Sequence, residues 1–361
     1  DIVELKTKWD TTKKNFRFIN RVSFTNPSFP FKIDMSVVKS SYSAKHTTIK
    51  ESGVFNSNET YEVEIEVLND MIKSFGTVKM IETMLKNTIK IILSGIQNTN
   101  YPISIQNETQ VKNAYYKLLH GKEKSILSPR DFCGPSSFTL ELKNIQPLTE
   151  DTTLPNIHNN YTVTDKADGV RKLLFIDPIG KVYLITMTIG IEFTGIIITD
   201  ETLFNTILDG EYILHDNNGN FFDTFAAFDI YYYNGESVRD LSFAPLEKIS
   251  DPSKYRLSLM KTCINDIKKS AKMVSKKEIN MKITAKTFYI GSESKSIFAG
   301  CREILMKEQN GLFPYETDGM IFTPSQFGVG GNKEGETTKP MKTAWIHSFK
   351  WKPAEFNTID F

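Results

Sequence analysis

Residues 161–176 read YTVTDKADGVRKLLFI, and this stretch decides the fold of the second part of the chain. Apolar and β-branched residues on both sides of a central turn predict two strands, Tyr161–Thr164 and Lys172–Ile176. Lys166 follows the first strand and precedes the second, so we expect it at the edge of a sheet, facing a cleft. The turn Lys166-Ala167-Asp168-Gly169 therefore combines a lysine with a carboxylate at one exposed point.

Four further short segments follow this turn along the chain and carry complementary chemistry. They are Asp209-Gly210-Glu211, Phe228-Asp229, Thr317-Asp318-Gly319 and Lys350-Trp351-Lys352-Pro353. Any one of them occurs by chance in many proteins, whereas the ordered set is specific. A lysine turn, two acidic turns and a terminal pair of lysines are the parts needed to attack a nucleoside triphosphate and to hold the product.

Lys166 is the candidate nucleophile of this set. A free lysine has a pKa of about 10.4 and is a poor nucleophile at neutral pH, so nearby cations, burial or a metal ion must activate it. The candidates for this activation are Arg171, Lys350, Lys352 and a divalent cation. The same cations would neutralise the α-phosphate and the leaving pyrophosphate.

The acidic turns supply hard oxygen ligands. Asp168, Glu211 and Asp318 are candidate ligands for Mg²⁺ or Mn²⁺ and candidate acceptors for ribose hydroxyl groups. Gly169, like the glycines of the other two acidic turns, directly follows an aspartate and allows a tight turn close to a nucleotide. Phe228 is placed to stack on a base, although an aromatic residue in a strand more often belongs to the core.

The five segments together resemble the covalent nucleotidyltransferases, which comprise mRNA capping guanylyltransferases and ATP- or NAD-dependent polynucleotide ligases. Three details are similar to capping enzymes. The fourth segment reads Thr317-Asp318-Gly319-Met320-Ile321-Phe322-Thr323-Pro324, where ligases usually have Glu-Gly. The fifth carries Trp351, and the third region runs from Phe228 to Asn234-Gly235-Glu236. The chain resembles in particular the capping enzymes of large DNA viruses, which combine an RNA triphosphatase with a guanylyltransferase.

This resemblance implies roles for the matching residues of the nucleotide pocket. Lys166 would be the site of GMP attachment, Arg171 and Glu211 would contact the ribose, and Phe228 would stack on guanine. The implied reaction is attack on GTP, followed by transfer of GMP to the 5′-diphosphate end of nascent mRNA.

The resemblance also implies how the phosphates are held. Asp318 would lie at the metal and the phosphates, and Lys350 and Lys352 would bind the α-phosphate. Asp168 and Gly169 complete the expected nucleotide-binding set. Mg²⁺ or Mn²⁺ is the implied cofactor, with GTP as substrate.

The first part of the chain alternates between apolar and polar residues, as strands do. The alternation predicts strands over residues 17–24, 31–39 and 61–67. Glu62, Glu64 and Glu66 are expected on one side of the third strand, because alternate residues of a strand point to the same face.

By the same resemblance, this part is similar to half of the metal-dependent RNA triphosphatase tunnel of viral capping enzymes. The three glutamates would hold a divalent cation, and Arg17, Arg21 and Lys39 would bind phosphates. The family has a further glutamate-rich strand nearer its N-terminus that this chain lacks, so the tunnel is expected to be partial. An alternating Glu/Val strand is also simply a half-exposed antiparallel strand.

The expected fold class is α+β with two domains. Residues 1–118 would form a partial, triphosphatase-like antiparallel β tunnel, and residues 119–361 a mixed, mainly antiparallel, ATP-grasp-like nucleotidyltransferase domain. The boundary is placed near residues 121–155, whose weak periodicity predicts a connection draped over a surface. The OB-fold of the family is expected to be absent, so the chain would belong to a larger polypeptide, such as one with a cap methyltransferase.

Several other elements can be predicted from periodicity. Residues 69–96 and 255–274 have helical spacing, and a further helix is expected to start at a cap near Ser294 or Ser296 and to end at Gly311. The glycine-rich segment from Gly328 to Gly335 predicts a mobile loop.

The composition excludes several classes of protein. The 361 residues carry 44 basic and 43 acidic side chains, a net charge of +1, which disfavours a generic nucleic-acid binder. The three cysteines lack metal-ligand spacing, and no apolar run approaches the roughly 20 residues of a membrane span. A reducing compartment is expected, and the resemblance implies the cytoplasm, in a viral factory or virion, with a methyltransferase and RNA polymerase as further partners.

Two alternative functions remain open at the level of sequence. One is an ATP-dependent RNA or DNA ligase, which uses the same lysine chemistry. The other is a catalytically silent scaffold of a capping complex, although the intact lysines and carboxylates argue against it.

Overall fold

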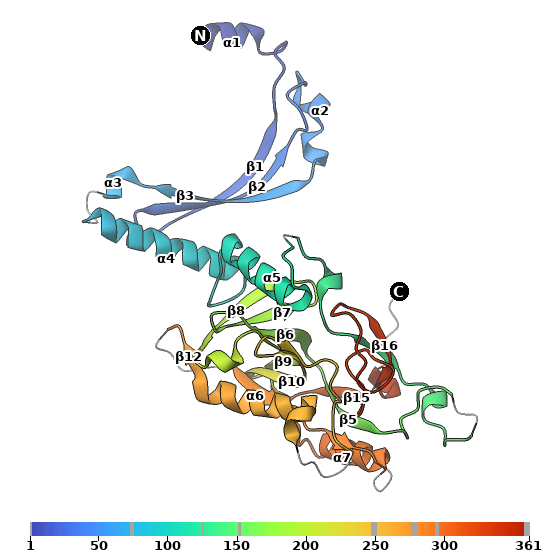
Figure 1. Ribbon diagram of the computed structural model, residues 1–361. Helices are drawn as coiled ribbons and strands as arrows, with labels where there is room; N and C mark the ends of the chain where they lie inside the picture. The colour runs from blue at the N-terminus through green and yellow to red at the C-terminus, as the bar shows by residue number, and fades with distance from the viewer. Residues whose placement is uncertain are drawn as a thin grey trace. The chain divides into compact units, whose positions relative to one another are not determined.

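The computed structural model contains two units (Figure 1). Residue contacts group Asp1–Asn98 into the first unit and Thr99–Phe361 into the second. The structure describes residues 2–72, 76–124, 126–150, 153–246, 251–275, 281–292 and 296–356. Within these ranges, no helix is long and apolar enough to cross a membrane.

The first unit is built on an antiparallel sheet of order β1-β2-β3. Its strands are β1 (Arg17–Thr25), β2 (Phe31–Ser40) and β3 (Glu59–Val67), which confirms the three predicted strands. The accompanying helices are α1 (Ile2–Lys8), α2 (Ile49–Ser52), the 3-10 turn η1 (Val54–Asn56), α3 (Asn69–Ile72) and α4 (Val78–Ile96). The predicted helical stretch 69–96 is thus α3 and α4, with residues 73–75 outside the described ranges.

The two faces of this sheet differ in chemistry. In the register, Arg21 lies opposite Ser36 and Ser36 opposite Glu62, so one face is polar. The alternate residues give an apolar face, most of which is exposed. Its exposed members are Phe18, Val22, Phe24, Met35, Tyr61, Val63 and Val67.

The second unit contains two sheets within the described residues. The larger has the order β11-β10-β9-β6-β7-β8-β12, with β13 paired to β10, and the smaller has the order β14-β5-β15-β16-β4. The strands of the larger sheet are β6 (Val170–Ile176), β7 (Lys181–Thr186), β8 (Ile191–Ile198), β9 (Thr206–His215), β10 (Phe221–Tyr233), β11 (Glu236–Ser237), β12 (Ala271–Met273) and β13 (Lys282–Ala285). Those of the smaller sheet are β4 (Ser136–Thr139), β5 (Tyr161–Ala167), β14 (Tyr289–Ile290), β15 (Thr317–Pro324) and β16 (Ala344–Trp351).

Most neighbouring strands are antiparallel, and the pairs β10·β13 and β16·β4 are parallel. Together with the helices, these sheets confirm a mixed α+β fold with mainly antiparallel sheets. The 3-10 turns of the unit are η2 (Pro129–Asp131), η3 (Leu142–Asn144), η4 (Glu201–Leu203), η5 (Pro252–Lys254) and η6 (Ala354–Phe356).

Helices α5 (Ile105–His120) and α6 (Arg256–Ser270) pack on opposite faces of the larger sheet. Leu173 of β6 belongs to the core that includes Tyr115 of α5, whereas the next residue, Leu174, belongs to the core that includes Met260 of α6. Successive residues of one strand thus point into two different cores, as the period of a strand requires.

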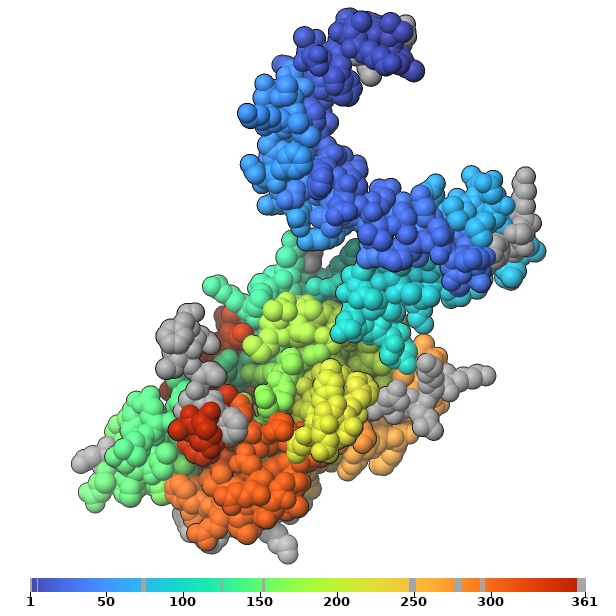
Figure 2. Space-filling view, turned by 180° about the vertical axis from the view of Figure 1, so that it is seen from behind, coloured from blue at the N-terminus to red at the C-terminus, as the bar shows by residue number. Residues whose placement is uncertain are grey.

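The smaller sheet has its own core against α7 (Ile297–Gln309), where Ile297 and Ile304 pack on Val163 and Phe322. Figure 2 shows α7, in orange, at the surface of the second unit. The helix begins where predicted, because the Ser296 hydroxyl accepts a hydrogen bond from the backbone N–H of Phe298. The alternative cap, Ser294, lies outside the described residues.

The observed division of the chain differs from the predicted boundary between residues 118 and 119. Helix α5 precedes that boundary, yet Val111, Tyr115 and Leu119 pack into the core of the second unit. The expected surface connection over residues 121–155 also contributes to this core, with Phe132 and Cys133 buried. Long-range packing of this kind leaves little periodic signal in a sequence.

Two other predictions were wrong in detail. Helix α6 ends at Ser270 and not near Val274, because residues 271–273 form β12 beside β8. The first half of the glycine-rich segment is packed and not a loose loop, because residues 328–331 are buried, whereas residues 332–335 are exposed as expected of a loop. A Cβ on Gly328 or Gly331 would clash with the backbone oxygen of Glu336, so the glycines permit close packing of two backbone segments.

A buried ion pair joins α6 to β10. The Arg256 guanidinium, which is 0% exposed, donates to both oxygens of Asp229 at 2.8 and 3.2 Å. It also donates to the backbone oxygens of Leu241 and Phe327. The pair therefore ties together β10, α6, the segment that contains Leu241 before α6 and the segment that contains Phe327 after β15.

We expect the variant Arg256→Met to lower the free energy of unfolding by about 3–5 kcal/mol, because it leaves the Asp229 carboxylate buried without its partner. Lys269→Met is the control, since it removes the cation of an exposed helical ion pair with Asp266. Chemical denaturation of both variants checks the prediction. Equal losses of stability in the two variants would contradict it.

Candidate active site

The smaller sheet brings three of the predicted segments together. Strand β15 lies between β5 and β16, so Asp318 on β15 is flanked by Lys166 on β5 and by the lysine segment that ends β16. Lys166 Nζ lies 2.5 Å from Oδ1 of Asp318, and Lys352 Nζ lies 2.6 Å from Oδ2. One carboxylate therefore holds two lysines.

The Asp318 side chain is only 10% exposed. Burial favours its neutral form, but the hydrogen bonds from Lys166 and Lys352 outweigh burial and hold the pKa of Asp318 below its usual value. The carboxylate is therefore ionised at neutral pH and neutralises the lysines beside it.

Gly319 makes this contact between strands possible. Strand β15 shifts register against β5 between Thr317 and Met320, and Gly319 takes a φ of 141°. A Cβ at this position would clash with the backbone oxygen of Trp351. Only glycine lets the end of β16, and with it Lys352, come close to Asp318.

A second charged group forms where β6 pairs with β9. Arg171 Nε donates to Oδ1 of Asp209 at 3.0 Å and Nη2 donates to Oδ2 at 2.5 Å. Asp209 is fully buried, and Arg171 lies opposite Glu211 in the register. The predicted ribose-contacting pair, Arg171 and Glu211, thus lies side by side.

Phe228 joins this group through an irregularity of β10. The register between β10 and β9 shifts between Ala227 and Asp229, so Phe228 is the extra residue of a bulge. Its ring is half-buried and lies 5.6 Å from the Arg171 guanidinium. The bulge therefore directs the predicted stacking residue toward Arg171.

The Glu211 carboxyl group is chemically unusual. Burial raises its pKa to about 7, against the opposing effect of the cations Lys286, Lys166 and Arg171. Glu211 lies opposite Arg171 in the register and also close to the lysine turn, because a Cβ on Gly169 would lie 2.8 Å from its Cγ. Glu211 is thus poised to gain or lose a proton near neutral pH.

The remaining predicted residues lie at the margin of these groups. Asp168 and Lys350 are exposed, and among the described residues neither joins the ion pairs of Lys166 and Arg171. Gly169 is pressed against the site, because a Cβ there would lie 2.8 Å from Cγ of Glu211.

The structure adds charged residues that sequence reasoning missed. Lys286 Nζ lies 2.9 Å from Oδ2 of Asp165, and both side chains are almost fully buried beside the lysine turn. Asp209 is the other addition. It opens the acidic turn and could have been considered with Glu211, whereas Lys286 and Asp165 meet only through the fold.

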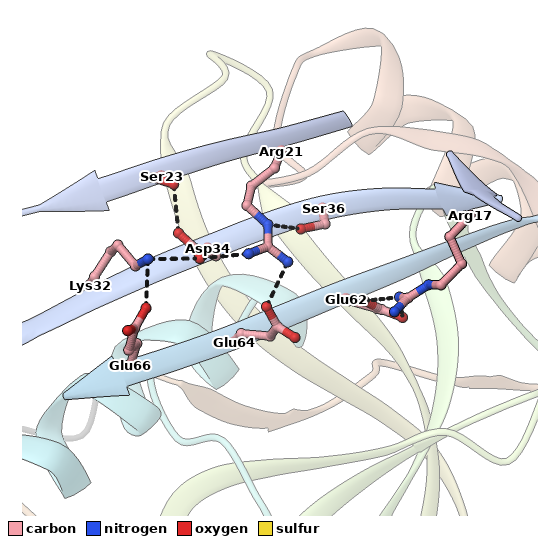
Figure 3. Close-up of polar contacts among 9 residues, drawn as sticks. All are labelled: Arg17, Arg21, Ser23, Lys32, Asp34, Ser36, Glu62, Glu64 and Glu66. Carbon is pink, nitrogen blue, oxygen red and sulfur yellow. Dashed lines mark hydrogen bonds and ion pairs between the residues drawn. The ribbon is translucent and has the colours of Figure 1, made fainter. Parts of the chain in front are cut away.

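The polar face of the first unit gathers the predicted triphosphatase residues (Figure 3). Glu62, Glu64 and Glu66 do share one face of β3, as predicted. Arg17 donates to both oxygens of Glu62, at 2.9 and 3.0 Å, and Lys32 lies 2.6 Å from Glu66.

Arg21 is the centre of this polar face. Its guanidinium donates to Asp34 at 3.0 Å, to Glu64 at 2.8 Å and to the Ser36 hydroxyl at 2.9 Å. Asp34 is buried, and hydrogen bonds from Ser23 and Lys32 hold its pKa below the usual value. Each carboxylate of the face thus has a cationic partner.

Lys39 does not share this face. It lies opposite Phe18 in the register, on the apolar side of the sheet, and donates to the backbone oxygen of Phe55 at 3.1 Å. Lys39 is an odd number of residues from Ser36 and Val38 of the polar face, and successive residues of a strand alternate between faces, so Lys39 lies on the other face. Within the described residues, no group of three or more carboxylate, histidine or cysteine side chains is arranged to hold a metal ion.

Comparison with known proteins places this geometry in a family. The model of the mRNA capping enzyme catalytic domain matches residues 95–339. The chain belongs to the mRNA capping enzyme family. The matched range contains Lys166, Arg171, Glu211, Phe228 and Asp318, and it confirms the family that the sequence resembles.

Viral and animal capping enzymes are among the relatives. The chain is 28% identical to the "Probable mRNA-capping enzyme" of Acanthamoeba polyphaga mimivirus, over 96% of the chain and 29% of the relative. It is 25% identical to the mRNA-capping enzyme of African swine fever virus (isolate Warthog/Namibia/Wart80/1980), over 96% of the chain and 36% of the relative. With the mRNA-capping enzyme of Danio rerio it shares 26% identity over 64% of the chain and 34% of the relative.

The chain matches only part of the length of these relatives. The chain spans about a third of the length of these capping enzymes. Because the viral matches cover 96% of the chain, they include most of the first unit. A solved structure named Pmar-Lig_PreS3 matches 62% of this chain and 46% of its own, at 13% identity and a TM-score of 0.35, and so weak a likeness carries no argument.

The raised pKa of Glu211 predicts a pH-dependent stability of this capping-enzyme domain. A carboxyl whose pKa rises from 4.5 when unfolded to about 7 when folded stabilises the fold fully below pH 4.5. This contribution falls by about 1.4 kcal/mol for each pH unit up to about 7. We therefore compare the unfolding temperature of Glu211→Gln with that of the wild type at each pH. We expect the difference, variant minus wild type, to be larger at pH 8 than at pH 5.

Thermal unfolding of both proteins at the two pH values measures this change. Glu201→Gln, at an exposed position, is the matched control for loss of a carboxylate. A difference between Glu211→Gln and wild type that stays constant from pH 5 to pH 8 would refute the assignment.

Proposed function

We propose that this chain is the guanylyltransferase part of a viral-type mRNA capping enzyme, in which Lys166 attacks the α-phosphate of GTP. The observation that carries the proposal is the position of Lys166. It lies on β5, 2.5 Å from Asp318 of β15, inside the range that matches the capping enzyme catalytic domain.

The proposed reaction has two steps. In the first, a bond forms between Lys166 Nζ and the α-phosphorus of GTP while the bond from this phosphorus to pyrophosphate breaks. In the second, an oxygen of a 5′-diphosphate RNA end takes the GMP, and Lys166 recovers its free amine. Lys166 must lose a proton before the attack, and the proposed first acceptor is Oδ1 of Asp318, to which this ammonium group donates. In the second step the bond from the phosphorus to Nζ breaks as the bond to the RNA oxygen forms, and the amine takes up a proton again.

The neighbouring residues support complementary roles. Lys352, held by the other oxygen of Asp318, is positioned to neutralise the α-phosphate, and Lys350 is proposed to assist it from β16. Arg171 and Glu211 are proposed to contact the ribose, and Phe228 the guanine. Asp168 and Gly169 of the lysine turn are proposed to complete the nucleotide-binding set.

The donor set is compatible with a divalent cation that arrives with the substrate. Mg²⁺ is commonly bound through one or two carboxylates together with substrate phosphates, and the ionised Asp318 is a carboxylate of this kind. When bound, Mg²⁺ or Mn²⁺ would neutralise negative charge on the triphosphate and on pyrophosphate as it leaves.

The first unit is proposed to derive from an RNA 5′-triphosphatase. The support is its antiparallel sheet, on which Glu62, Glu64 and Glu66 line one face together with Arg17 and Arg21. We propose that this sheet is part of a β tunnel, with the glutamates as metal ligands and the arginines as phosphate ligands. Lys39, on the other face, has no part in this proposal.

The finer fold and setting are also proposals. We propose an ATP-grasp-like arrangement for the nucleotidyltransferase unit, because the charged residues of the site lie on strands of two sheets, Lys166 and Asp318 on β5 and β15 and Glu211 on β9. On the resemblance to viral capping enzymes alone, we also propose a cytoplasmic setting, in a viral factory or virion, with a methyltransferase and RNA polymerase as further partners.

We expect the protein to become covalently labelled by GTP that carries ³²P at the α-phosphate, and Lys166→Ala to abolish the label. Lys269→Ala, which removes an exposed lysine of α6, is the matched control and should label like the wild type. Denaturing gel electrophoresis detects the adduct. Label from α-³²P ATP alone would show a ligase-type enzyme, and label that survives Lys166→Ala would exclude the mechanism.

For the first unit, we expect release of phosphate from the γ-position of 5′-triphosphate RNA in the presence of Mn²⁺, and a loss of at least tenfold in Glu64→Gln. Glu59→Gln is the matched control, because Glu59 lies on the same strand but opposite Lys39, on the other face of the sheet. Thin-layer separation of the released phosphate measures the rate. Equal rates in the two variants would show that the polar face is not the site.

A further inference from the structure

The Arg171 side chain is fixed by several hydrogen bonds within the protein. Its guanidinium forms the two-pronged bond to Asp209, and Nη1 donates to the backbone oxygen of Pro135 at 2.8 Å. Of the five N–H groups of an arginine, these bonds engage Nε, one on Nη1 and one on Nη2. Each terminal nitrogen therefore keeps a second N–H.

Two aromatic rings also lie near the guanidinium. Its carbon Cζ lies 5.4 Å from the centre of the Phe132 ring and 5.6 Å from that of Phe228. Such contacts between a guanidinium and aromatic rings are attractive and orient its plane. Phe228 is the proposed guanine-stacking residue, so the same ring faces both the arginine and the expected base.

The segment Phe132–Pro135 can reach Arg171 only because it contains Gly134. A Cβ on Gly134 would clash with Nη2 of Arg171 and would lie 2.9 Å from Oδ2 of Asp209. Glycine is thus required here for steric reasons, at a point some 35 residues before Arg171 in the chain. Sequence patterns had predicted a surface connection at this point.

The Asp209 carboxylate is held in turn by Tyr231. The Tyr231 hydroxyl donates to Oδ2 of Asp209 at 2.5 Å, and Tyr231 is only 2% exposed. The same oxygen accepts from Arg171, so the tyrosine fixes the carboxylate that fixes the arginine. Burial and the nearby Asp209 carboxylate raise the pKa of Tyr231 far above its usual value, so its hydroxyl stays a donor.

We propose that Tyr231, acting through Asp209, and the segment Phe132–Pro135 are positioning residues that present the two remaining N–H groups of Arg171 to the ribose of the bound nucleotide. This inference rests on the proposed guanylyltransferase function. It assigns a part of the nucleotide pocket to a segment that precedes the lysine turn, outside all five sequence segments.

The first test is kinetic. We expect Tyr231→Phe to raise the GTP concentration for half-maximal labelling of Lys166 by about tenfold, with the labelling rate at saturation unchanged, because one hydrogen bond to a charged group is lost. Tyr232→Phe is the matched control, since Tyr232 is the neighbouring buried tyrosine of β10 and is partnered with Ser237 of β11. Gly134→Ala should act like Tyr231→Phe, whereas Gly95→Ala, where a Cβ meets nothing within 4 Å, should not.

A double-mutant comparison separates positioning from a general structural effect. In an Arg171→Lys background, which lacks the two-pronged bond, Tyr231→Phe should change half-maximal labelling by less than twofold. A tenfold effect that persists in that background would overturn the proposal. So would a Tyr231→Phe protein with unchanged half-maximal labelling.

A readout without nucleotide distinguishes failure of this inference from failure of the proposed function. The chain contains seven arginines, so the Nε–H signal of Arg171 can be assigned by its absence in Arg171→Lys. We expect hydrogen exchange at this Nε–H to accelerate at least tenfold in Tyr231→Phe and to stay unchanged in Tyr232→Phe. A wild type that takes no label from GTP would refute the guanylyltransferase, whereas unchanged exchange in Tyr231→Phe would refute the positioning role.

Discussion

The shared carboxylate of Asp318 is the interaction on which the arrangement of the site depends. Two lysines that belong to different strands can contact the same carboxylate only if the strand that carries Asp318 lies between them. The order β5-β15-β16 provides this, and the backbone at Gly319 shortens the distance between the last two strands. Without the carboxylate, two ammonium groups would lie close together and repel each other.

Around this centre, the larger sheet supplies a second set of charges of a different kind. Asp209 is fully buried and holds the Arg171 guanidinium through a two-pronged bond, whereas Lys166 and Lys352 each contact one oxygen of Asp318 from a flexible stem. The first group would recognise the nucleotide in a fixed position, and the second would contact its phosphates. This division suits a reaction in which the α-phosphate is transferred from one group to another. The bulge of β10 adds Phe228 to the group that recognises the nucleotide, since it directs this ring toward Arg171.

Sequence patterns correctly predicted the elements that depend on interactions between residues close together in the chain. Alternation located β1, β2 and β3, and the cap at Ser296 located the start of α7. Resemblance to a family selected Lys166, Asp318 and Lys352, which the structure then brought into contact. Family membership was recognisable from short motifs because the chemistry restricts which residues can occupy them.

The errors have a common physical cause, which is contact between segments far apart in the chain. Residues 121–155 and the glycine-rich segment looked like loops because they lack periodicity, yet Phe132 is buried and residues 328–331 pack against another backbone segment. Arg171 could be chosen from sequence, but its partners Pro135 and Tyr231 could not. Lys39 was grouped with Arg17 and Arg21 as a phosphate ligand by resemblance, but it lies on the other face of the sheet, opposite Phe18.

The sheet of the first unit has a consequence for how this chain behaves outside its cellular setting. Among the described residues, β1 and β3 are edge strands, each nine residues long, and the sheet between them exposes apolar side chains on one face. Free edges offer hydrogen-bonding groups to any extended segment, and charged side chains on the polar face make stacking on that side unfavourable. We therefore expect the apolar face of this sheet to favour association with other molecules and the charged face to oppose it. The solubility of the first unit then depends on which face a neighbouring molecule meets.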